Sequence, residues 1–250
     1  ASFLVFSPCF SQNDSAFQDG EYLKFRVRYG VFNASYASLL LKNKVYEGKT
    51  VYHALGKGET TGLAKLFFKV DDTYESYFDK NTGKPYFFNR DIYEGGYTKK
   101  LNFFFNFDTN NLRIKNLENN EEKNMPIQPD IKDVISTLHY LRNNPKMNSL
   151  NKNDEVSMDM IFDDDEVYRF RLKFLGREKV NTPLGDINTL IFRPLVQDGR
   201  VFKEQESLTL WISDDQNKIP VKIKASLRVG SLVGEIISFN GLKHPTTLKK

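Results

Sequence analysis

Alternation of apolar and polar residues along short segments is the feature that most constrains this chain. In GEYLKFRVRYG, residues 20–30, every second position is apolar: Leu23, Phe25, Val27 and Tyr29. Successive side chains of a β-strand point to opposite faces, so this period of two is typical of a strand with one buried face. The segment therefore predicts a half-buried strand that ends at Gly30.

Similar segments recur along most of the chain, separated by residues that favour turns. Two strands are predicted within residues 34–58, joined at Glu47 and Gly48. Further strands are predicted at 73–79, 85–95, 97–107, 111–117, 155–162, 167–176, 187–195, 206–213, 218–227 and 232–239. Clusters of Gly, Asn, Asp and Thr lie between them. Short strands at this spacing predict an antiparallel meander of about twelve strands.

One segment departs from the period of two. Residues 129–145 place five apolar side chains on one face of a helix: Ile131, Val134, Ile135, Leu138 and Leu141. Asp130 is the expected N-cap, and Asn143, Asn144 and Pro145 are expected to end the helix. We expect a helix of about fourteen residues.

These elements predict a mainly β fold, a curved antiparallel sheet or open β-barrel with one packed α-helix. The composition agrees, because 21 Phe and 12 Tyr in 250 residues favour strands, whose pleated surface accommodates flat rings. The charged segment 116–129 is interpreted as a surface crossing. Residues 12–250 are therefore expected to form a single β-rich domain.

The first eleven residues, ASFLVFSPCFS, carry no charge and are mostly apolar. They resemble the end of a secretory signal peptide that is cleaved before Gln12. A buried N-terminal strand is the alternative. The run is too short for a transmembrane span, which needs about 20 apolar residues. We expect an exported protein of the periplasm or cell envelope.

Cys9 is the only cysteine in the chain. Acylation of a lipoprotein cysteine is the alternative to simple cleavage, but Phe6, Ser7 and Pro8 depart from the usual motif before such a cysteine. If Cys9 is removed, the remaining chain contains no thiol. Disulfides, thiol catalysis and cysteine-based zinc sites would then be excluded.

The charges predict no nucleic-acid partner. The chain has 36 Lys and Arg and 32 Asp and Glu, a net charge of +4, without a dense basic block. Nucleic-acid-binding proteins usually gather basic residues on one face.

Two acidic clusters are candidate sites. Asp214 and Asp215 lie between two predicted strands and are interpreted as an exposed hairpin tip, since Asp commonly satisfies backbone donors in turns. The run Asp163, Asp164, Asp165 and Glu166, with Asp159 upstream, resembles a cation site, but its acids are consecutive and lack the spacing of a calcium loop. A hairpin turn is the favoured interpretation, and no metal is predicted.

Other catalytic signals are weak, and no cofactor is predicted. His53, His139 and His244 are scattered, and His139 is interpreted as a surface residue of the helix although Ser136 lies one turn away. No Gly-x-Ser-x-Gly motif is present. The segment GKGETTG (56–62) lacks the ending of a phosphate-binding loop and is interpreted as a connection.

Consecutive aromatic residues leave two interpretations open. Pairs such as Phe67 and Phe68 point to both faces of a strand, so they either pack in a core or line an apolar cavity inside a curved sheet. The predicted lining of such a cavity is Phe25, Val27, Tyr29, Phe67, Phe68, Phe78 and Trp211.

Four blocks in order carry a family resemblance: GEYLKFRVRYG, LFFKVDDTYESYFDKNTGKPYFFNRDIYEGGY, DVISTLHYLR and LWISDDQNKIPVKI. They resemble an exported bacterial family, domain-of-unknown-function family 3108, common in the Bacteroidetes, over roughly residues 20–243. The resemblance implies an envelope protein with no established activity. The last block is also similar to periplasmic lipoprotein carriers, whose curved sheet surrounds an apolar cavity closed by several helices.

Three functions follow as hypotheses. The first is a non-enzymatic envelope protein that binds an apolar or lipid-like ligand. The second is an interaction module that scaffolds protein partners in the envelope. The third is a glycan hydrolase that uses the acidic loops Asp163, Asp164, Asp214 and Asp215.

Overall fold

The computed structural model describes residues 15–62, 64–164, 166–195, 208–227 and 230–249. The segment 1–14, on which the export and lipidation predictions rest, lies outside these residues, as does Asp165. The side chains of Leu66 and Phe67 are likewise not described.

The described residues are mostly in strands. The strands are β1 (Tyr22–Tyr29), β2 (Phe32–Tyr46), β3 (Lys49–Thr60), β4 (Asp71–Asp79), β5 (Pro85–Glu94), β6 (Tyr97–Asn106), β7 (Asn111–Asn116), β8 (Glu122–Pro126), β9 (Lys132–Asp133), β10 (Glu155–Ile161), β11 (Val167–Thr182), β12 (Gly185–Leu195), β13 (Leu208–Ser213), β14 (Pro220–Ser226) and β15 (Ser231–Asn240). The helices are α1 (Ala64–Phe67), α2 (Val134–Arg142) and the 3-10 turn η1 (Pro145–Asn148).

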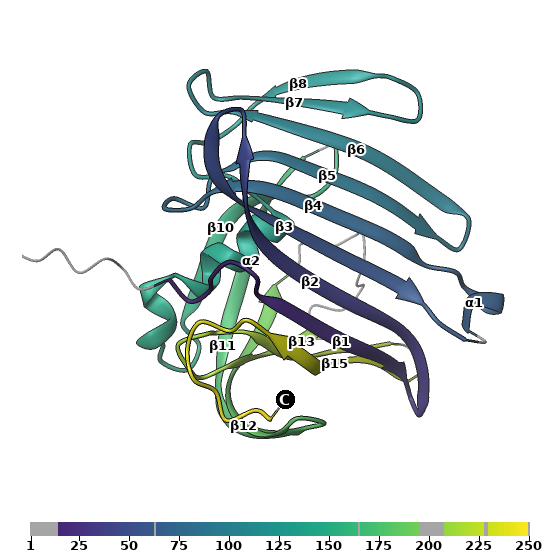
Figure 1. The fold of residues 1–250 in the computed structure, drawn as a ribbon, viewed down its shortest axis with the longest axis vertical. Helices are drawn as coiled ribbons and strands as arrows, with labels where there is room; N and C mark the ends of the chain where they lie inside the picture. Colours follow the sequence, from purple (N-terminus) through teal and green to yellow (C-terminus); the bar gives the residue numbers. More distant parts are fainter. Residues whose placement is uncertain (1–14, 63, 165, 196–207, 228–229, 250) are drawn as a thin grey trace, which may run out of the picture.

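The fifteen strands form one open sheet in the order β8-β7-β6-β5-β4-β3-β2-β1-β15-β14-β13-β12-β11-β10-β9. Neighbouring strands are antiparallel, except that the two-residue β9 pairs parallel to β10. The sheet thus consists of two meanders joined by the pairing of β1 with β15. Figure 1 shows these two halves curving around α2. The predicted curved antiparallel sheet with one packed helix is confirmed.

Side chains fill the concave side of the sheet in three packed clusters. The first gathers residues of β1–β4 and of β12, β14 and β15, including Leu23, Phe78 and Ile236. The second belongs to β10–β13, and the third joins β5–β7 to the end of β10. Ile135 of α2 packs against the first and third clusters, and Leu141 belongs to the second. The helix therefore connects all three parts of the core.

The helix is shorter than predicted. It covers nine residues, and its N-cap is Asp133, not Asp130. Asp133 accepts hydrogen bonds from the backbone N–H groups of Ile135 and Ser136, both at 2.8 Å. Lys132 and Asp133 pair with Met160 and Ile161, and this extended backbone prevents an earlier helix start.

Two other sequence interpretations are corrected. The described residues contain fifteen strands where about twelve were expected. Residues 56–60 of GKGETTG belong to β3, so they are not a connection. The charged segment 116–129 lies mostly at the surface, as expected, but it contains the edge strand β8, whose register with β7 pairs Leu112 with Met125.

Candidate functional site

A cleft of about 790 Å³ opens at one end of the curved sheet, and we call it the mouth cleft. Five segments form most of it: the N-terminal residues 15–17, the turn 79–83 between β4 and β5, the C-terminal end of α2 with residues 143–148, residues 216–218, and residues 243–244. These segments lie far apart in the sequence. The fold brings them together because β1 and β15 are neighbours and α2 lies between the two halves of the sheet.

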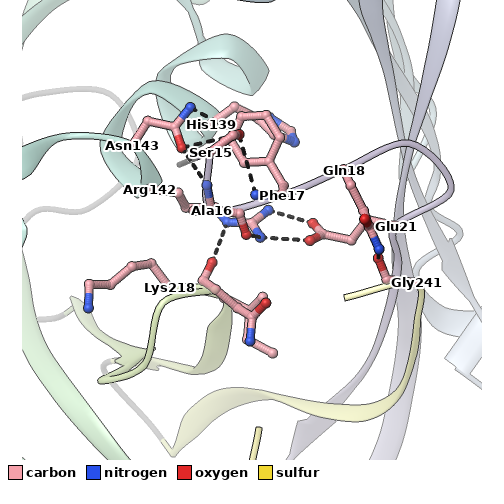
Figure 2. A network of polar contacts seen from close by, with 12 residues as sticks. Ser15, Ala16, Phe17, Gln18, Glu21, His139, Arg142, Asn143, Lys218 and Gly241 are labelled. Atoms are coloured by element: carbon pink, nitrogen blue, oxygen red, sulfur yellow. Dashed lines mark hydrogen bonds and ion pairs between the residues drawn. The ribbon is translucent and has the colours of Figure 1, made fainter. Parts of the chain in front are cut away.

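A buried ion pair holds the N-terminal side of the mouth cleft in place. The guanidinium of Arg142 donates to both carboxylate oxygens of Glu21, at 2.5 and 2.8 Å, and both side chains are almost fully buried. Arg142 also donates from Nε to the carbonyl oxygen of Asn217, at 2.9 Å. Figure 2 shows Arg142 reaching Glu21 beneath the segment that carries Ala16 and Phe17. A paired, hydrogen-bonded charge of this kind can remain buried, whereas either partner alone could not.

Residues 15–17 cover the apolar floor of the cleft. Phe17 is 2% exposed and packs edge-on against the rings of Tyr52 and His139, at centroid distances of 5.4 and 4.9 Å. The backbone N–H of Ala16 donates to the side-chain oxygen of Asn143 at 2.8 Å. His244 contacts the carbonyl oxygen of Ser15 at 2.9 Å. The N-terminal segment is thus fastened to both α2 and the C-terminal segment.

The charged rim of the mouth cleft is predominantly basic. Lys80, Lys218 and Lys243 line it, while the charge of Arg142 is balanced by Glu21. Burial lowers the pKa of Lys218, whose ammonium donates to the carbonyl oxygen of Asp215 at 2.8 Å. Hydrogen bonds from Thr82 and Asn81 hold the pKa of Asp79 below its usual value despite the opposing effect of burial, so the carboxylate is used within its own turn. Asp79 keeps its negative charge and Lys218 lies 3.9 Å from Asp214, so the cleft carries a small excess of positive charge, which favours an anion.

His139 lies in the floor of the cleft, which corrects its interpretation as a surface residue. It is 1% exposed. Burial, together with the nearby positive charge of Arg142, lowers its pKa to about 3, so the ring is neutral at physiological pH. Nδ1 lies 2.9 Å from the carbonyl oxygen of Ile135, and a carbonyl can only accept. Nε2 is then the acceptor nitrogen, and it has no hydrogen-bond partner among the described residues.

The predicted apolar lining is dispersed. Phe78 belongs to the first core cluster, with Phe25 packed against it. Tyr29 and Phe68 are 41% and 56% exposed. Val27 is half-buried on β1, and the ring of Trp211 lies on β13 beneath the ammonium of Lys222. The side chain of Phe67 is outside the described residues. Of the members of this set whose side chains are described, only Phe78 lines the mouth cleft.

The acidic run after β10 is paired with basic side chains. Asp163 contacts Arg90 at 2.9 Å and Lys99 at 2.6 Å, and Asp164 contacts Lys99 at 2.8 Å. These hydrogen bonds and charges lower the pKa of Asp163 to about 2, against the effect of burial. Arg90 and Lys99 belong to β5 and β6, so these ion pairs connect the two ends of the sheet. In the described part of the chain no group of three or more acidic, His or Cys side chains could hold a metal ion.

The second acidic pair lies in the turn between β13 and β14. Oδ1 of Asp215 accepts from Ser213 Oγ at 2.7 Å and from the backbone N–H groups of Asn217 and Lys218. The turn is not fully exposed as expected, because Asn217 and Lys218 are buried. The C-terminal segment covers them, and the amide of Asn217 donates to the carbonyl oxygens of His244 and Pro245.

A hydrolytic arrangement around Ser136 is not formed. The hydroxyl of Ser136 donates within the cap of α2, to the carboxylate of Asp133 at 2.9 Å, while His139 bonds to the carbonyl of Ile135. The two side chains are engaged with different partners.

The fold and the cleft together define the class of protein to which this chain belongs. Its members have an open, strongly curved antiparallel sheet around a central helix, here α2, and a basic cleft at one end of the sheet. The model of the family described as "Protein of unknown function (DUF3108)" matches residues 24–237, and the chain belongs to that family. No curated protein matches the sequence.

One solved structure supports the fold, and two others resemble it more weakly. A β-barrel-like protein of domain-of-unknown-function family 1849 from Brucella abortus is 9% identical, with a TM-score of 0.58, covering 90% of this chain and 98% of its own. A Bacteroides fragilis protein, provisionally described as exported and with a YmcC-like fold, is 9% identical, with a TM-score of 0.40 and coverages of 90% and 97%. A Parabacteroides distasonis protein, provisionally described as a lipoprotein, is 12% identical, with a TM-score of 0.36 and coverages of 90% and 98%. Among the described residues, no helix is both long and apolar enough to cross a membrane.

Proposed function

We propose that this protein is a non-enzymatic, exported protein of the cell envelope that binds an anionic amphipathic ligand in the mouth cleft. The observation that carries the proposal is a basic rim, Lys80, Lys218 and Lys243, beside the exposed ring of Tyr140, which also lines the cleft. A phosphate or carboxylate head would contact the lysines, and a short apolar portion would pack against Tyr140.

The dimensions of the site favour a ligand that enters only in part. A volume of about 790 Å³ is typical of small-molecule clefts. The concave side behind the cleft is occupied by packed side chains such as Phe78 and Ile236. A long acyl chain therefore has less room than in a lipoprotein carrier whose sheet surrounds an apolar cavity. The head group of the ligand is expected to contribute more of the binding free energy than the acyl chain. The uncharged apolar segment 1–11 supports export.

Calorimetric titration with octyl phosphate tests the proposal. Octyl glucoside, which has the same alkyl group without a charge, and inorganic phosphate, which has the charge without the alkyl group, are the controls. Octyl phosphate should bind, and the double variant Lys80→Ala, Lys243→Ala should bind it at least about tenfold more weakly. The matched control, Lys42→Ala with Lys224→Ala, removes two exposed lysines outside the cleft and should bind like the parent protein. Equal weakening in both double variants, or equal binding of octyl glucoside, would contradict the proposal.

A protein-interaction module is the second candidate function, because the tip of the β1–β2 hairpin is unusually apolar and exposed. Val31 is 85% and Phe32 is 74% exposed. Exposed apolar side chains of this size often mark contact surfaces. Photocrosslinking from position 32 in cells should trap one defined protein, whereas a monomer without crosslinks would exclude this function.

A further inference from the structure

A second groove, which we call the outer groove, has a volume of about 580 Å³ and shares no lining residue with the mouth cleft. Its lining includes four aromatic residues, Tyr46, Tyr86, Phe104 and the buried Phe105, and three amides, Asn106, Asn111 and Asn124. Phe104 lies between the buried Phe103 and Phe105, so strand alternation directs its ring away from the core. The groove therefore lies on the outer face of the sheet.

Phe104 belongs to a row of side chains that crosses several strands. The register pairs His53 with Tyr77, Tyr77 with Phe87, Phe87 with Phe104, and Phe104 with Arg113. Ring centroids along the row are 4.5 Å apart for His53 and Tyr77, 5.9 Å for Tyr77 and Phe87, and 5.3 Å for Phe87 and Phe104. These rings are only half-buried, although they belong to a protein whose core is already filled. The sheet thus presents a band of aromatic surface on its outside.

Tyr46 extends this band toward the groove. Its ring lies 5.1 Å from that of Tyr77 and 6.2 Å from that of Phe87, and the Phe87 pair is stacked with an interplanar angle of 27°. Tyr46 ends β2, and the tight turn that follows uses positive φ angles at Glu47 and Gly48. The hairpin therefore brings one aromatic ring beside the row from outside it, and together they form a platform next to the groove.

The polar groups of the groove have unused hydrogen-bonding capacity. The side-chain oxygen of Asn106 accepts from the backbone N–H groups of Asp108 and Thr109, whereas no hydrogen bond within the described part of the chain engages the side-chain amides of Asn111 or Asn124. Each such amide can donate twice and accept twice. The two charged residues that line the groove, Glu47 and Arg113, are of opposite sign. Arg113 also contacts Glu122 at 3.3 Å and lies 4.0 Å above the ring of Phe104.

We propose that the outer groove binds a neutral oligosaccharide. The C–H face of a sugar ring packs against the negative face of an aromatic ring, and the hydroxyl groups at its edge require donors and acceptors of the kind that amides supply. From Tyr86 on β5 to Asn124 on β8 the groove crosses three interstrand spacings, about 14 Å in all, enough for a short chain of sugar rings. The opposed charges do not favour a polyanion such as a nucleic acid, and an open groove rich in amides is unsuited to a lipid tail.

Nuclear magnetic resonance titration of the protein with cellotetraose and chitotetraose tests this inference. At least one of the two should shift the side-chain amide signals of Asn111 and Asn124. Phe104→Ala should weaken that binding about tenfold, because it removes the ring on which Arg113 and Phe87 pack and so disrupts the platform that contacts the ligand. Asn124→Ala should weaken saccharide binding severalfold. Asn124 is an exposed residue of the edge strand β8, so this substitution should have little effect on the stability of the fold. The matched control is Tyr36→Ala, which removes a half-buried aromatic ring of β2 that does not line the groove.

Three outcomes would overturn the inference: no shift with either neutral tetrasaccharide at millimolar concentration, equal weakening by Tyr36→Ala and Phe104→Ala, or binding only of an acidic tetrasaccharide such as tetragalacturonate. The last result would show that charge, not the aromatic platform, is recognised. Because the outer groove and the mouth cleft share no lining residue, Lys80→Ala with Lys243→Ala should leave saccharide binding unchanged. Failure of one proposal is therefore distinguishable from failure of the other.

Discussion

Single residues decide how the mouth cleft is assembled, and the most important are those that no local pattern identifies. Glu21 and Arg142 are 121 positions apart in the chain, yet they form the buried ion pair beneath Phe17. The alternation that predicts β1 begins at Leu23 and assigns no role to Glu21. Arg142 looks like an ordinary charged residue at the end of a helix. Only the tertiary fold buries both, so the sequence alone could not predict this pair.

Removing either member of this ion pair should lower the stability of the folded protein. Glu21→Gln should lower the free energy of unfolding by about 3 kcal/mol, because it leaves the guanidinium of Arg142 buried without its counter-charge. Replacing both, as Glu21→Gln with Arg142→Met, should cost less than the sum of the two single changes, since neither charge is then left unpaired. Urea unfolding of the four proteins measures the coupling. Additive effects would contradict a direct ion pair.

At the scale of elements, the sequence predicted most strands and the presence of α2, but not the position where α2 begins. Asp130 and Asp133 both precede apolar helical positions, so the local cap signals could not separate them. The choice depends on the parallel pairing of Lys132 and Asp133 with β10, a contact between residues nearly thirty positions apart. The short strands β8 and β9 were missed for a similar reason, because their sequences show no alternation of their own.

The two aspartates offer a matched test of the cap. Asp133→Ala should lower the free energy of unfolding by about 2 kcal/mol, because the N–H groups of Ile135 and Ser136 and the hydroxyl of Ser76 lose their acceptor. Asp130→Ala, at an exposed position before the cap, should change it by less than about 0.5 kcal/mol. Thermal unfolding followed by circular dichroism compares the two. An equal effect would indicate that Asp133 does not act as the cap.

At the scale of the whole molecule, the curved sheet is stabilised by contacts between its ends as well as by its strand ladder. The ladder connects β8 to β9 through all other strands, and β8 and β9 are not neighbours in it. Ile131 and Ile161 instead pack against residues of β5–β7, and Asp163 pairs with Arg90 and Lys99. The sequence predicted the acidic turn, but the position of its basic partners depends on how far the sheet curves, which no local pattern records.

The ion pairs of Asp163 with Arg90 and Lys99 predict that the stability of the protein falls at low pH. The pKa of Asp163 is about 2 in the folded protein, below its ordinary value of 3.8, so its contribution to stability is present above pH 4 and is lost as the pH falls toward 2. Asp163→Asn should therefore destabilise the protein at pH 7, by about 1 kcal/mol after allowance for solvent screening, with a difference that shrinks below pH 4. Unfolding measured across pH 2–7 tests this. A difference independent of pH would exclude the ion pair as its cause.

The pairing of β1 with β15 has a consequence for how the polypeptide acquires its structure. Residues 22–29 hydrogen-bond to residues 232–240, so the central seam of the sheet cannot close until residue 240 has been synthesised. Contacts so distant along the chain carry a large loop-closure cost and slow the folding reaction. A polypeptide that crosses a membrane N-terminus first would hold two unjoined meanders, each with an unpaired edge, until residue 240 has crossed. Any chaperone that assists this protein is expected to shield β1 during that interval.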